Sequence, residues 1–288
     1  MAAYTPAVID GDLYRAERFE LVKAQTGIRD PVELKQHILA VQAKAYDLLS
    51  YPCIRRFEFA TPRISTYSAY THVLAVGRER PGAILLDVGC CFGTDIRQAA
   101  SDGFPRQNLI ASDLRPEFWD FGHELFRSTP ETFPVPFIAG DVLDPEFLEP
   151  REPLLTRASE PSATHPALTS LATLTPLHGR HVAAIHISLV FHLFLEPKQL
   201  QLARALAGLL SPVPGSVILG SHVGLREKGF REGLCIAGRS MFCHSPQSWR
   251  EMWETVFPKG SIDVEAELHR RASDTPGAGV LVWSVTRV

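Results

Sequence analysis

The stretch AILLDVGCCFGTD, residues 83–95, decides the fold. Its apolar run, AILLDV, leads into the glycine-bearing turn GCCFG, and a helical pattern begins near Thr94. An apolar run that ends in a carboxylate is typical of a buried strand in a parallel sheet. The stretch therefore predicts a strand, a tight turn and a helix, the unit from which α/β sheets are built.

Apolar runs and helical stretches alternate along the rest of the chain. Further strands are expected over residues 108–113, 135–141, 181–187 and 215–222, and helices over 116–126, 197–210 and 245–257. Two strand-like runs, 262–268 and 280–288, then follow without a helix between them, which predicts an antiparallel hairpin at one sheet edge. The fold class is therefore α/β, with a mainly parallel sheet.

The first 80 residues have a different pattern, which is mostly helical. Residues 30–49 form one apolar stripe, with Asp30 placed to cap the helix and Pro31 at its first position. We expect residues 1–80 to form a helical cap on a domain of residues 81–288. Residues 143–180 are rich in Pro, Ser and Thr, and are predicted to be a long surface insertion with a short helix near 166–174.

Composition and charge exclude several classes of protein. Hydrophobic residues make up 45% and charged residues 21% of the 288, the balance of a folded globular chain. The net charge of −3 offers no basic field for a phosphate backbone. No apolar run approaches the roughly 20 residues that span a bilayer, and the first residues do not resemble a signal peptide. We expect a cytoplasmic enzyme without nucleic-acid or membrane partners. The sequence does not determine its oligomeric state.

The turn after the first strand lacks the pattern that dinucleotides need. The phosphate-binding fingerprint is G-x-G-x-x-G, but Cys91 stands where its second glycine belongs. Asp87, just before the turn, would repel a phosphate and attract a cation. S-adenosylmethionine carries an ammonium group and a sulfonium but no phosphate, so its charges suit this turn. The absence of the second glycine also disfavours an NAD-dependent dehydrogenase.

Carboxylates also end the next two expected strands. Asp113 can accept hydrogen bonds from both hydroxyls of a ribose, and Asp141 can accept from an adenine amine while Val142 lies against the ring. Ligands of open α/β sheets bind at the carboxyl ends of the strands. We therefore expect Asp87, Asp113 and Asp141 to line one binding site.

These motifs resemble those of the class I S-adenosylmethionine-dependent methyltransferases. LLDVGCCFGTD is similar to the glycine motif of that family, ASDL to its acidic motif, GDVLDP to its adenine motif and IHISLVFHLF to its fourth-strand motif. YPCIRRFEF, the double cysteine, PGSVILGSHVG and FCHSPQSWREMW resemble a fungal subgroup of secondary metabolism that includes carboxyl O-methyltransferases of meroterpenoid pathways. The resemblance covers most of the chain and implies a Rossmann-like class I methyltransferase sheet with a helical N-terminal cap.

The resemblance also implies the cofactor and its site. S-adenosyl-L-methionine would be the cofactor and S-adenosyl-L-homocysteine the product, with a small molecule as methyl acceptor. The residues expected to bind the cofactor are Asp87, Gly89, Cys90, Cys91, Gly93, Asp113, Leu114, Asp141, Val142 and His186. No metal is expected, because the stretch after the fourth strand lacks the clustered Asp and Asn ligands of a catechol-type site.

Histidines are the candidate catalytic residues, since imidazole titrates near neutral pH. His186 and His222 end the fourth and fifth strands, which are neighbours in the usual sheet order, so both rings are expected to face the cofactor's methyl group. The expected substrate-binding residues are Tyr51, Arg55, His192 and His222. Aromatic residues of the cap that are candidates for the acceptor pocket are Tyr46, Tyr51, Phe57, Phe59, Tyr67 and Tyr70.

The expected function is O-methylation of a small hydrophobic carboxylic acid or phenol in secondary metabolism, by an enzyme of class EC 2.1.1. The reaction is in-line displacement at the sulfonium methyl, in which the protein mainly aligns the reactants and excludes water. Two alternatives stay open. One is an N- or C-methyltransferase on the same fold, and the other is a non-catalytic S-adenosylmethionine-binding regulator.

Overall fold

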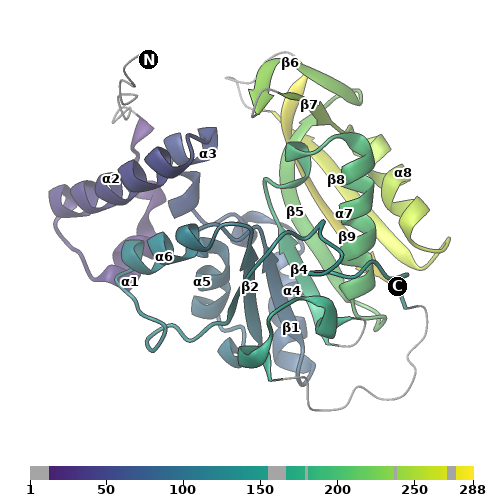
Figure 1. Ribbon diagram of the computed structural model, residues 1–288, viewed down its shortest axis with the longest axis horizontal. Helices are drawn as coiled ribbons and strands as arrows, with labels where there is room; N and C mark the ends of the chain where they lie inside the picture. Colours follow the sequence, from purple (N-terminus) through teal and green to yellow (C-terminus); the bar gives the residue numbers. More distant parts are fainter. Residues whose placement is uncertain (1–12, 155–166, 179–180, 237–238, 271–276) are drawn as a thin grey trace.

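A seven-stranded sheet forms the centre of the computed structural model, which describes residues 13–154, 167–178, 181–236, 239–270 and 277–288 (Figure 1). The strand order is β3-β2-β1-β4-β5-β9-β8. The strands of this sheet are β1 Ile84–Val88, β2 Leu109–Asp113, β3 Phe137–Ala139, β4 Val182–Ile187, β5 Val217–Leu225, β8 Ile262–His269 and β9 Ala278–Arg287. β1 to β5 run parallel, while β9 pairs antiparallel with both β5 and β8. The predicted α/β class and its antiparallel C-terminal hairpin are confirmed.

Helices cover both faces of this sheet. They are α1 Glu20–Thr26, α2 Pro31–Leu48, α3 Pro52–Arg55, α4 Tyr70–Glu79, α5 Thr94–Ser101, α6 Pro116–Leu125, α7 Glu196–Leu209 and α8 Pro246–Val256. On one face, Leu206 of α7 and Trp249 of α8 pack against the sheet. On the other face, Val73 of α4 and Ile96 of α5 do so. The sheet therefore lies inside a three-layer sandwich, and its carboxyl edge is left to the loops.

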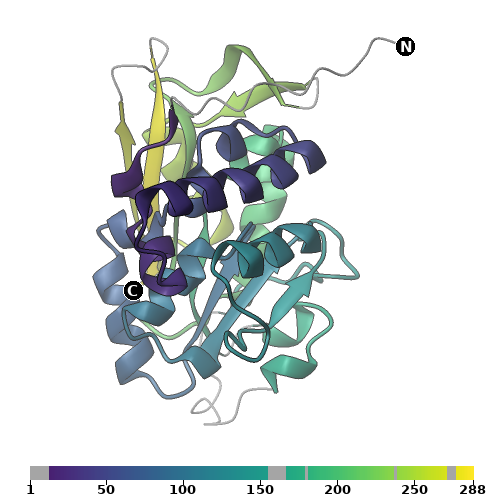
Figure 2. The ribbon, with the colours of Figure 1, turned by 90° about the vertical axis from the view of Figure 1, so that its left-hand side faces the viewer.

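The N-terminal helices pack on the loops and helices of that second face. Asp30 caps α2 by accepting from the backbone N–H of Val32, as the sequence predicted. The buried side chains of α1, α2 and α3 share one apolar cluster with Phe92 of the glycine-bearing turn and Phe118 of α6. Figure 2 shows α2 lying across the front of the molecule in that view. The cap is thus packed directly against the turn that follows β1.

The stretch over residues 143–180 differs from its prediction. Outside residues 155–166 and 179–180, it contains two 3₁₀ turns, η6 Leu168–Ser170 and η7 Thr175–Leu177, in place of an α-helix near 166–174. It is also less superficial than predicted, because Phe147 and Leu174 are buried in the core beside α7. Its prolines break α-helical hydrogen bonding, but its apolar side chains still pack in the core cluster on one face of the sheet.

A second, two-stranded sheet was not predicted. It consists of β6 Gly229–Ile236 and β7 Arg239–Cys243, which pair antiparallel. Phe230 of this hairpin is 59% exposed and packs edge-on against Phe242. The sequence signal is weak here, because basic residues and glycines interrupt the apolar alternation.

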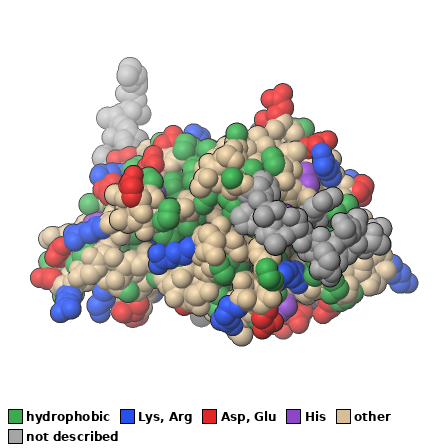
Figure 3. Space-filling model, turned by 90° about the horizontal axis from the view of Figure 1, so that it is seen from below, with side chains coloured by type: hydrophobic (Ala, Val, Ile, Leu, Met, Phe, Trp, Pro, Cys, Tyr) green, Lys and Arg blue, Asp and Glu red, His purple; other side chains and the backbone are tan. Residues whose placement is uncertain are grey.

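Charge is distributed evenly over the visible surface. On the face in Figure 3, Lys and Arg side chains lie interspersed with Asp and Glu. In the described part of the chain, no helix is long and apolar enough to cross a membrane.

Candidate active site

In the turn after β1, residues 89, 91 and 93 all have the positive φ that favours glycine. Gly89, Cys91 and Gly93 have φ of 68°, 52° and 68°. A Cβ atom at Gly89 would lie 2.4 Å from Cγ2 of Val190, and one at Gly93 would lie 2.5 Å from the Trp119 ring. Cys91 therefore keeps the left-handed conformation that glycine would adopt there at lower cost. The turn thus keeps its left-handed backbone although its second glycine is replaced.

Asp87 lies buried below this turn, with 2% of its surface exposed. Its Oδ1 atom is 2.7 Å from Nδ1 of His186 on the neighbouring strand β4. Its Oδ2 atom is also buried and has no hydrogen-bond partner. An orphaned carboxylate oxygen is costly, so this position fits a ligand that brings a hydrogen-bond donor with positive charge.

Asp113 ties the turn to the end of β2. Its Oδ2 accepts from the backbone N–H of Cys91 at 2.8 Å, and its Oδ1 accepts from Arg115 N–H at 2.9 Å. A carboxylate offers about four lone-pair sites, so two remain for a ligand. Leu114, the next residue, is 59% exposed. An exposed leucine beside a half-buried carboxylate suits the sugar and ring of a nucleoside.

Asp141 follows β3, and the pairing of β3 with β2 sets Ala139 opposite Asp113. The Asp141 side chain is exposed and accepts from Leu143 N–H at 2.9 Å, while Val142 is half-buried. β1, β2 and β3 are adjacent in the sheet, so their three aspartates follow three neighbouring strands. The expected grouping of these carboxylates at one edge agrees with this topology.

His186 is held between two partners on β4. Besides Asp87 at Nδ1, its Nε2 is 2.9 Å from Oγ of Ser188, and only 2% of the residue is exposed. Burial lowers the pKa of His186, but the charges of Asp87 and Asp95 outweigh burial and raise it above its ordinary value. The ring is thus a base whose free nitrogen is covered by a serine.

His222 does not share the surroundings of His186, contrary to expectation. The strands are neighbours as predicted, but His186 pairs with Leu219, so residue 222 points to the opposite face of the sheet. There His222 is 1% exposed, lies 4.5 Å from the Trp249 ring centroid and accepts from Nε1 of Trp283 at 3.0 Å. Burial lowers its pKa well below the ordinary value. The two rings cannot act on one methyl group from there.

The other expected acceptor-binding residues lie in three places. His192 sits in the 3₁₀ turn η8 Phe191–Leu193, ahead of α7, and is buried with a pKa lowered to about 4, mainly by burial. Tyr51 is half-buried and packs against the same apolar cluster as Cys91 of the turn after β1. Arg55 is exposed at the end of α3. The structure thus spreads these residues around the edge and does not gather them at one point.

The aromatic residues of the N-terminal cap also differ in how close they lie to this edge of the sheet. Tyr67 is buried, and its ring lies 5.9 Å from that of His186. Tyr70 donates to Asp102, the residue that follows the last residue of α5, at 2.7 Å. Because α5 begins at the cofactor turn, its far end lies away from the site, and so does the Tyr70 hydroxyl.

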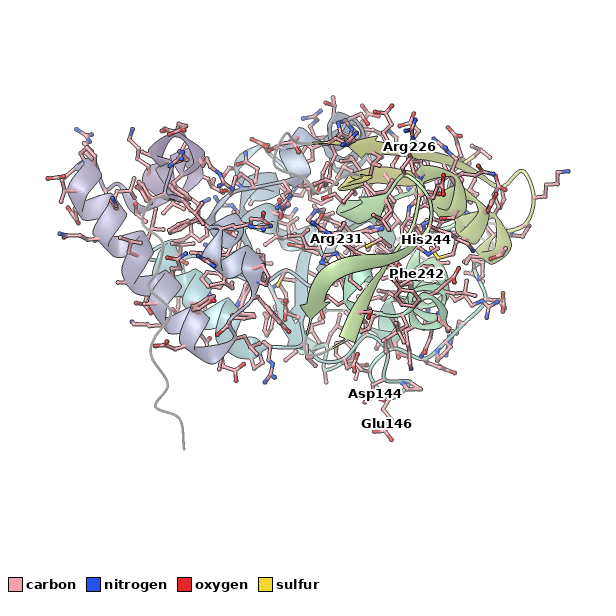
Figure 4. The ribbon with its side chains drawn as sticks, turned by 90° about the horizontal axis from the view of Figure 1, so that it is seen from above. Asp144, Glu146, Arg226, Arg231, Phe242 and His244 are labelled. Carbon is pink, nitrogen blue, oxygen red and sulfur yellow. The ribbon has the colours of Figure 1, made fainter. Side chains whose placement is uncertain are left out.

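Across the carboxyl edge from the cap lies the β6–β7 hairpin. Figure 4 labels Arg231 and Phe242 on its paired strands and His244 just beyond, with the N-terminal helices on the opposite side of the view. Asp144 and Glu146 point outward at the margin. Within the described residues, no group of three His, Cys, Asp or Glu side chains is arranged to hold a metal ion.

The sheet order, the glycine-bearing turn and the three strand-end aspartates define a class I S-adenosylmethionine-dependent methyltransferase. A family model described as "Meroterpenoid methyltransferase N-terminal domain" matches residues 4–60. The chain is 32% identical over 232 residues to methyltransferase adrK of Penicillium rubens, covering 81% of this chain and 73% of that protein. It is 30% identical over 264 residues to the Asnovolin E/Chermesin D methyltransferase nvfJ of Aspergillus novofumigatus, covering 88% and 83%. The chain belongs to this family of fungal secondary-metabolism methyltransferases.

Two further matches are one curated relative and one solved structure. O-methyltransferase atr3 of Stereocaulon alpinum is 30% identical over 243 residues, which cover 83% of this chain but only 62% of that protein. Among solved structures, a Burkholderia thailandensis 1,6-didemethyltoxoflavin-N1-methyltransferase has a TM-score of 0.48 and 15% identity, covering 88% of this chain and 90% of that one. A likeness this distant transfers no residue role.

Sequence reasoning missed Ser188 and the hydroxyl of Tyr67. Ser188 lies within the fourth-strand motif, between His186 and His192. The sequence predicted only that the Tyr67 ring lines the acceptor pocket. A serine two residues after a strand-end histidine was the available signal, since side chains two apart on a strand lie on the same face.

Proposed function

We propose that this enzyme is an O-methyltransferase that transfers the methyl group of S-adenosylmethionine to an oxygen atom of a small hydrophobic acid or phenol. The cofactor supplies a methyl group already activated on a sulfonium, so the protein has to bind, orient and exclude water. The observation that carries the proposal is the row of three aspartates after three neighbouring strands, beside a turn in which Gly89, Cys91 and Gly93 have positive φ.

The residues of the edge fit the cofactor part by part. Oδ2 of Asp87 lacks a partner and suits the ammonium of the methionine moiety, beside the turn formed by Gly89, Cys90, Cys91 and Gly93. The free lone pairs of Asp113 suit the two ribose hydroxyls. The exposed Leu114 and the half-buried Val142 suit the two faces of the adenine ring, with Asp141 near its amine.

The acceptor would lie between the described part of the N-terminal cap, residues 13–80, and the β6–β7 hairpin, above the end of β4. The cap reaches the site through Tyr67, which packs beside His186. On the other side, Arg231 of β6 acts electrostatically on His192. Two apolar side chains near this proposed acceptor site, Leu193 and Phe230, are 38% and 59% exposed. Their exposure suits an acceptor with a hydrophobic body.

A transfer assay with isotopically labelled S-adenosylmethionine tests this proposal. The enzyme is incubated with a set of alkylated phenols, benzoic acids, anilines and enolisable diketones, and each product is located by mass spectrometry. Label on oxygen is the expected result. Label on nitrogen or carbon would contradict O-methylation, and cofactor binding without transfer to any class would favour a regulatory role.

A further inference from the structure

A row of hydrogen-bonded side chains connects the N-terminal cap to the carboxylate below the cofactor turn. Oδ1 of Asp87 is 2.7 Å from Nδ1 of His186, and Nε2 of His186 is 2.9 Å from Oγ of Ser188. The hydroxyl of Tyr67 lies 2.8 Å from Oγ of Ser188 and 2.8 Å from Oγ of Ser221. The row therefore joins β1, β4 and β5 of the sheet to one residue of the cap.

Each hydrogen bond of this row fixes the direction of the next. An ionised Asp87 only accepts, so Nδ1 of His186 carries a proton, and in the neutral ring Nε2 accepts from the Ser188 hydroxyl. The Ser188 oxygen accepts from the Tyr67 hydroxyl and from the backbone N–H of Ser221 at 3.2 Å. The Tyr67 oxygen accepts from the hydroxyl of Ser221. From His186 to Ser221, each side-chain polar atom thus has a partner inside the fold, and none is left to bind a substrate.

His186 controls the charge of Asp87 as well as its orientation. Both side chains are buried. Burial raises the pKa of the Asp87 carboxyl, and the charge and the hydrogen bond of His186 are the main effects that oppose this rise. Without His186, the carboxyl would take up a proton and lose the charge that attracts an ammonium. The bond from Nδ1 of His186 also engages Oδ1, so Oδ2 is the oxygen left for a ligand.

The cap end of the row is fixed by the helix that begins at the cofactor turn. Asp95, in the first turn of α5, accepts from the backbone N–H groups of Arg63 and Ile64 at 2.6 and 2.7 Å. Ile64 begins the 3₁₀ turn η4 Ile64–Thr66, and the buried Tyr67 follows that turn directly. The position of the Tyr67 hydroxyl therefore depends on how this segment of the cap packs on α5. A displacement of the segment would take the hydroxyl away from β4.

We propose that Tyr67 is a positioning residue for cofactor binding: through Ser188 and His186, it holds the Asp87 carboxylate in the orientation that receives the ammonium of S-adenosylmethionine. Docking of the cap and binding of the amino-acid end of the cofactor then stabilise each other. This rests on the proposed function, in which Asp87 meets that ammonium. The role requires no proton transfer, because each hydroxyl of the row keeps its own hydrogen.

Two ligands that differ only in the ammonium test this proposal. One is S-adenosylhomocysteine, and the other is 4-(5′-adenosylthio)butanoate, the same molecule without its amino group. By calorimetry, Tyr67→Phe should weaken binding of S-adenosylhomocysteine about fivefold, and His186→Phe, one step closer to Asp87, roughly 30-fold. Neither variant should change the affinity for the butanoate by more than about twofold. Tyr70→Phe is the matched control, because it removes a buried tyrosine hydroxyl that donates to Asp102, outside the row, and it should change neither affinity.

A double-mutant cycle shows whether Tyr67 acts through Asp87. Asp87→Asn already lacks the charge that attracts the ammonium, so adding Tyr67→Phe to it should cause no further loss of affinity for S-adenosylhomocysteine. If Tyr67→Phe alone does not fold, as judged by circular dichroism, Ser188→Ala takes its place with the same expectations, because it removes the link between Tyr67 and His186.

Three results would overturn the proposal. They are an unchanged affinity for S-adenosylhomocysteine in Tyr67→Phe, an equal loss for both ligands, and a loss that persists in full in the Asp87→Asn background. A wild-type protein that binds both ligands equally well also overturns it, because no group then recognises the ammonium. A wild-type protein that binds neither ligand contradicts the proposed function itself, which separates the two failures.

Discussion

The two halves of the carboxyl edge are organised differently. Over β1 to β3, the candidate groups are carboxylates and a backbone turn that follow the ends of neighbouring strands. Over β4 and β5, they are side chains sorted by the sheet, with His186 on one face and His222 on the other. In the first half, position along the strand is enough to bring groups together. In the second half, the alternation of side chains along each strand decides which groups meet. A shift of one residue moves a side chain to the opposite face of the sheet.

The comparison separates two kinds of buried polar group. Asp87 keeps one oxygen without a partner and His186 keeps its base behind a serine, which are arrangements that a ligand completes. His222 sits in a cage of aromatic rings and accepts from Trp283, which is an arrangement that the fold itself completes. Mutations in the first group should affect ligands, and mutations in the second should affect folding.

The largest expected effect is at the turn. In Gly89→Val, a side chain would collide with Val190 and force a β-branched residue to a φ of 68°, so binding of S-adenosylhomocysteine should fall below detection, at least roughly 100-fold. Calorimetry measures it, with circular dichroism to confirm folding. Gly27→Val is the matched control, because its φ is 70° but nothing lies within 4 Å of the Cβ position. If the control loses binding equally, backbone strain and not the turn is responsible.

Acid should destabilise the folded protein through His192 and His244, which are buried in their neutral form. Burial lowers the pKa of His192 and of His244 to about 4. Below pH 6.5 these histidines bind protons in the unfolded chain, whereas in the folded chain they stay neutral. Their contribution to the free energy of unfolding is therefore complete above that pH and is lost as pH falls. The loss should be about 2 kcal/mol for each histidine between pH 8 and pH 5.

Urea unfolding at several pH values measures this loss. His192→Phe and His244→Phe should each flatten the dependence of unfolding free energy on pH. His269→Gln, at an exposed position on β8, serves as the control and should keep the wild-type slope. A wild-type protein equally stable at pH 5 and pH 8 would show that these rings are protonated in the folded state.

Asp113→Ala should weaken S-adenosylhomocysteine binding by about 1.5–3 kcal/mol, the range of hydrogen bonds to a charged group. The change also frees the Cys91 N–H, so Asp113→Asn, which keeps an acceptor, should recover part of the affinity. Asp144→Ala is the control. Asp144 accepts from the backbone N–H two residues later at 2.9 Å, as Asp113 does, but it points outward at the margin of the molecule. Equal losses in both variants would remove Asp113 from the ribose site.

The smallest effect is expected at His222. His222→Phe keeps the ring volume but leaves Nε1 of Trp283 without its acceptor, which should lower the free energy of unfolding by about 1–3 kcal/mol. The pH dependence of kcat should stay as in the wild type. Thermal unfolding and the pH–rate profile are measured together. A variant of normal stability with a changed profile would return His222 to the reaction site.

Most of the fold was predictable because its signals are local. The apolar run over residues 83–88, the cap at Asp30 and the consecutive strands near the C-terminus each depend on neighbours in sequence. The β6–β7 hairpin was missed, since β7 carries Arg239 and Ser240 and its pairing with β6 is set by tertiary contacts. The 3₁₀ turns of residues 143–180 were misjudged as a helix and a surface loop, because proline disrupts helical hydrogen bonds without preventing burial.

The sequence by itself determined the α/β class, the turn after β1 and the aspartates after β1, β2 and β3, since strand ends in a parallel sheet meet at one edge wherever the strands are found. Tertiary structure alone decided the partners of the histidines. Asp87 and His186 are 99 positions apart, and Tyr67 and Ser188 are 121 apart. Their contacts depend on the register between strands and on how the cap docks, and neither is written in the spacing of residues along the chain.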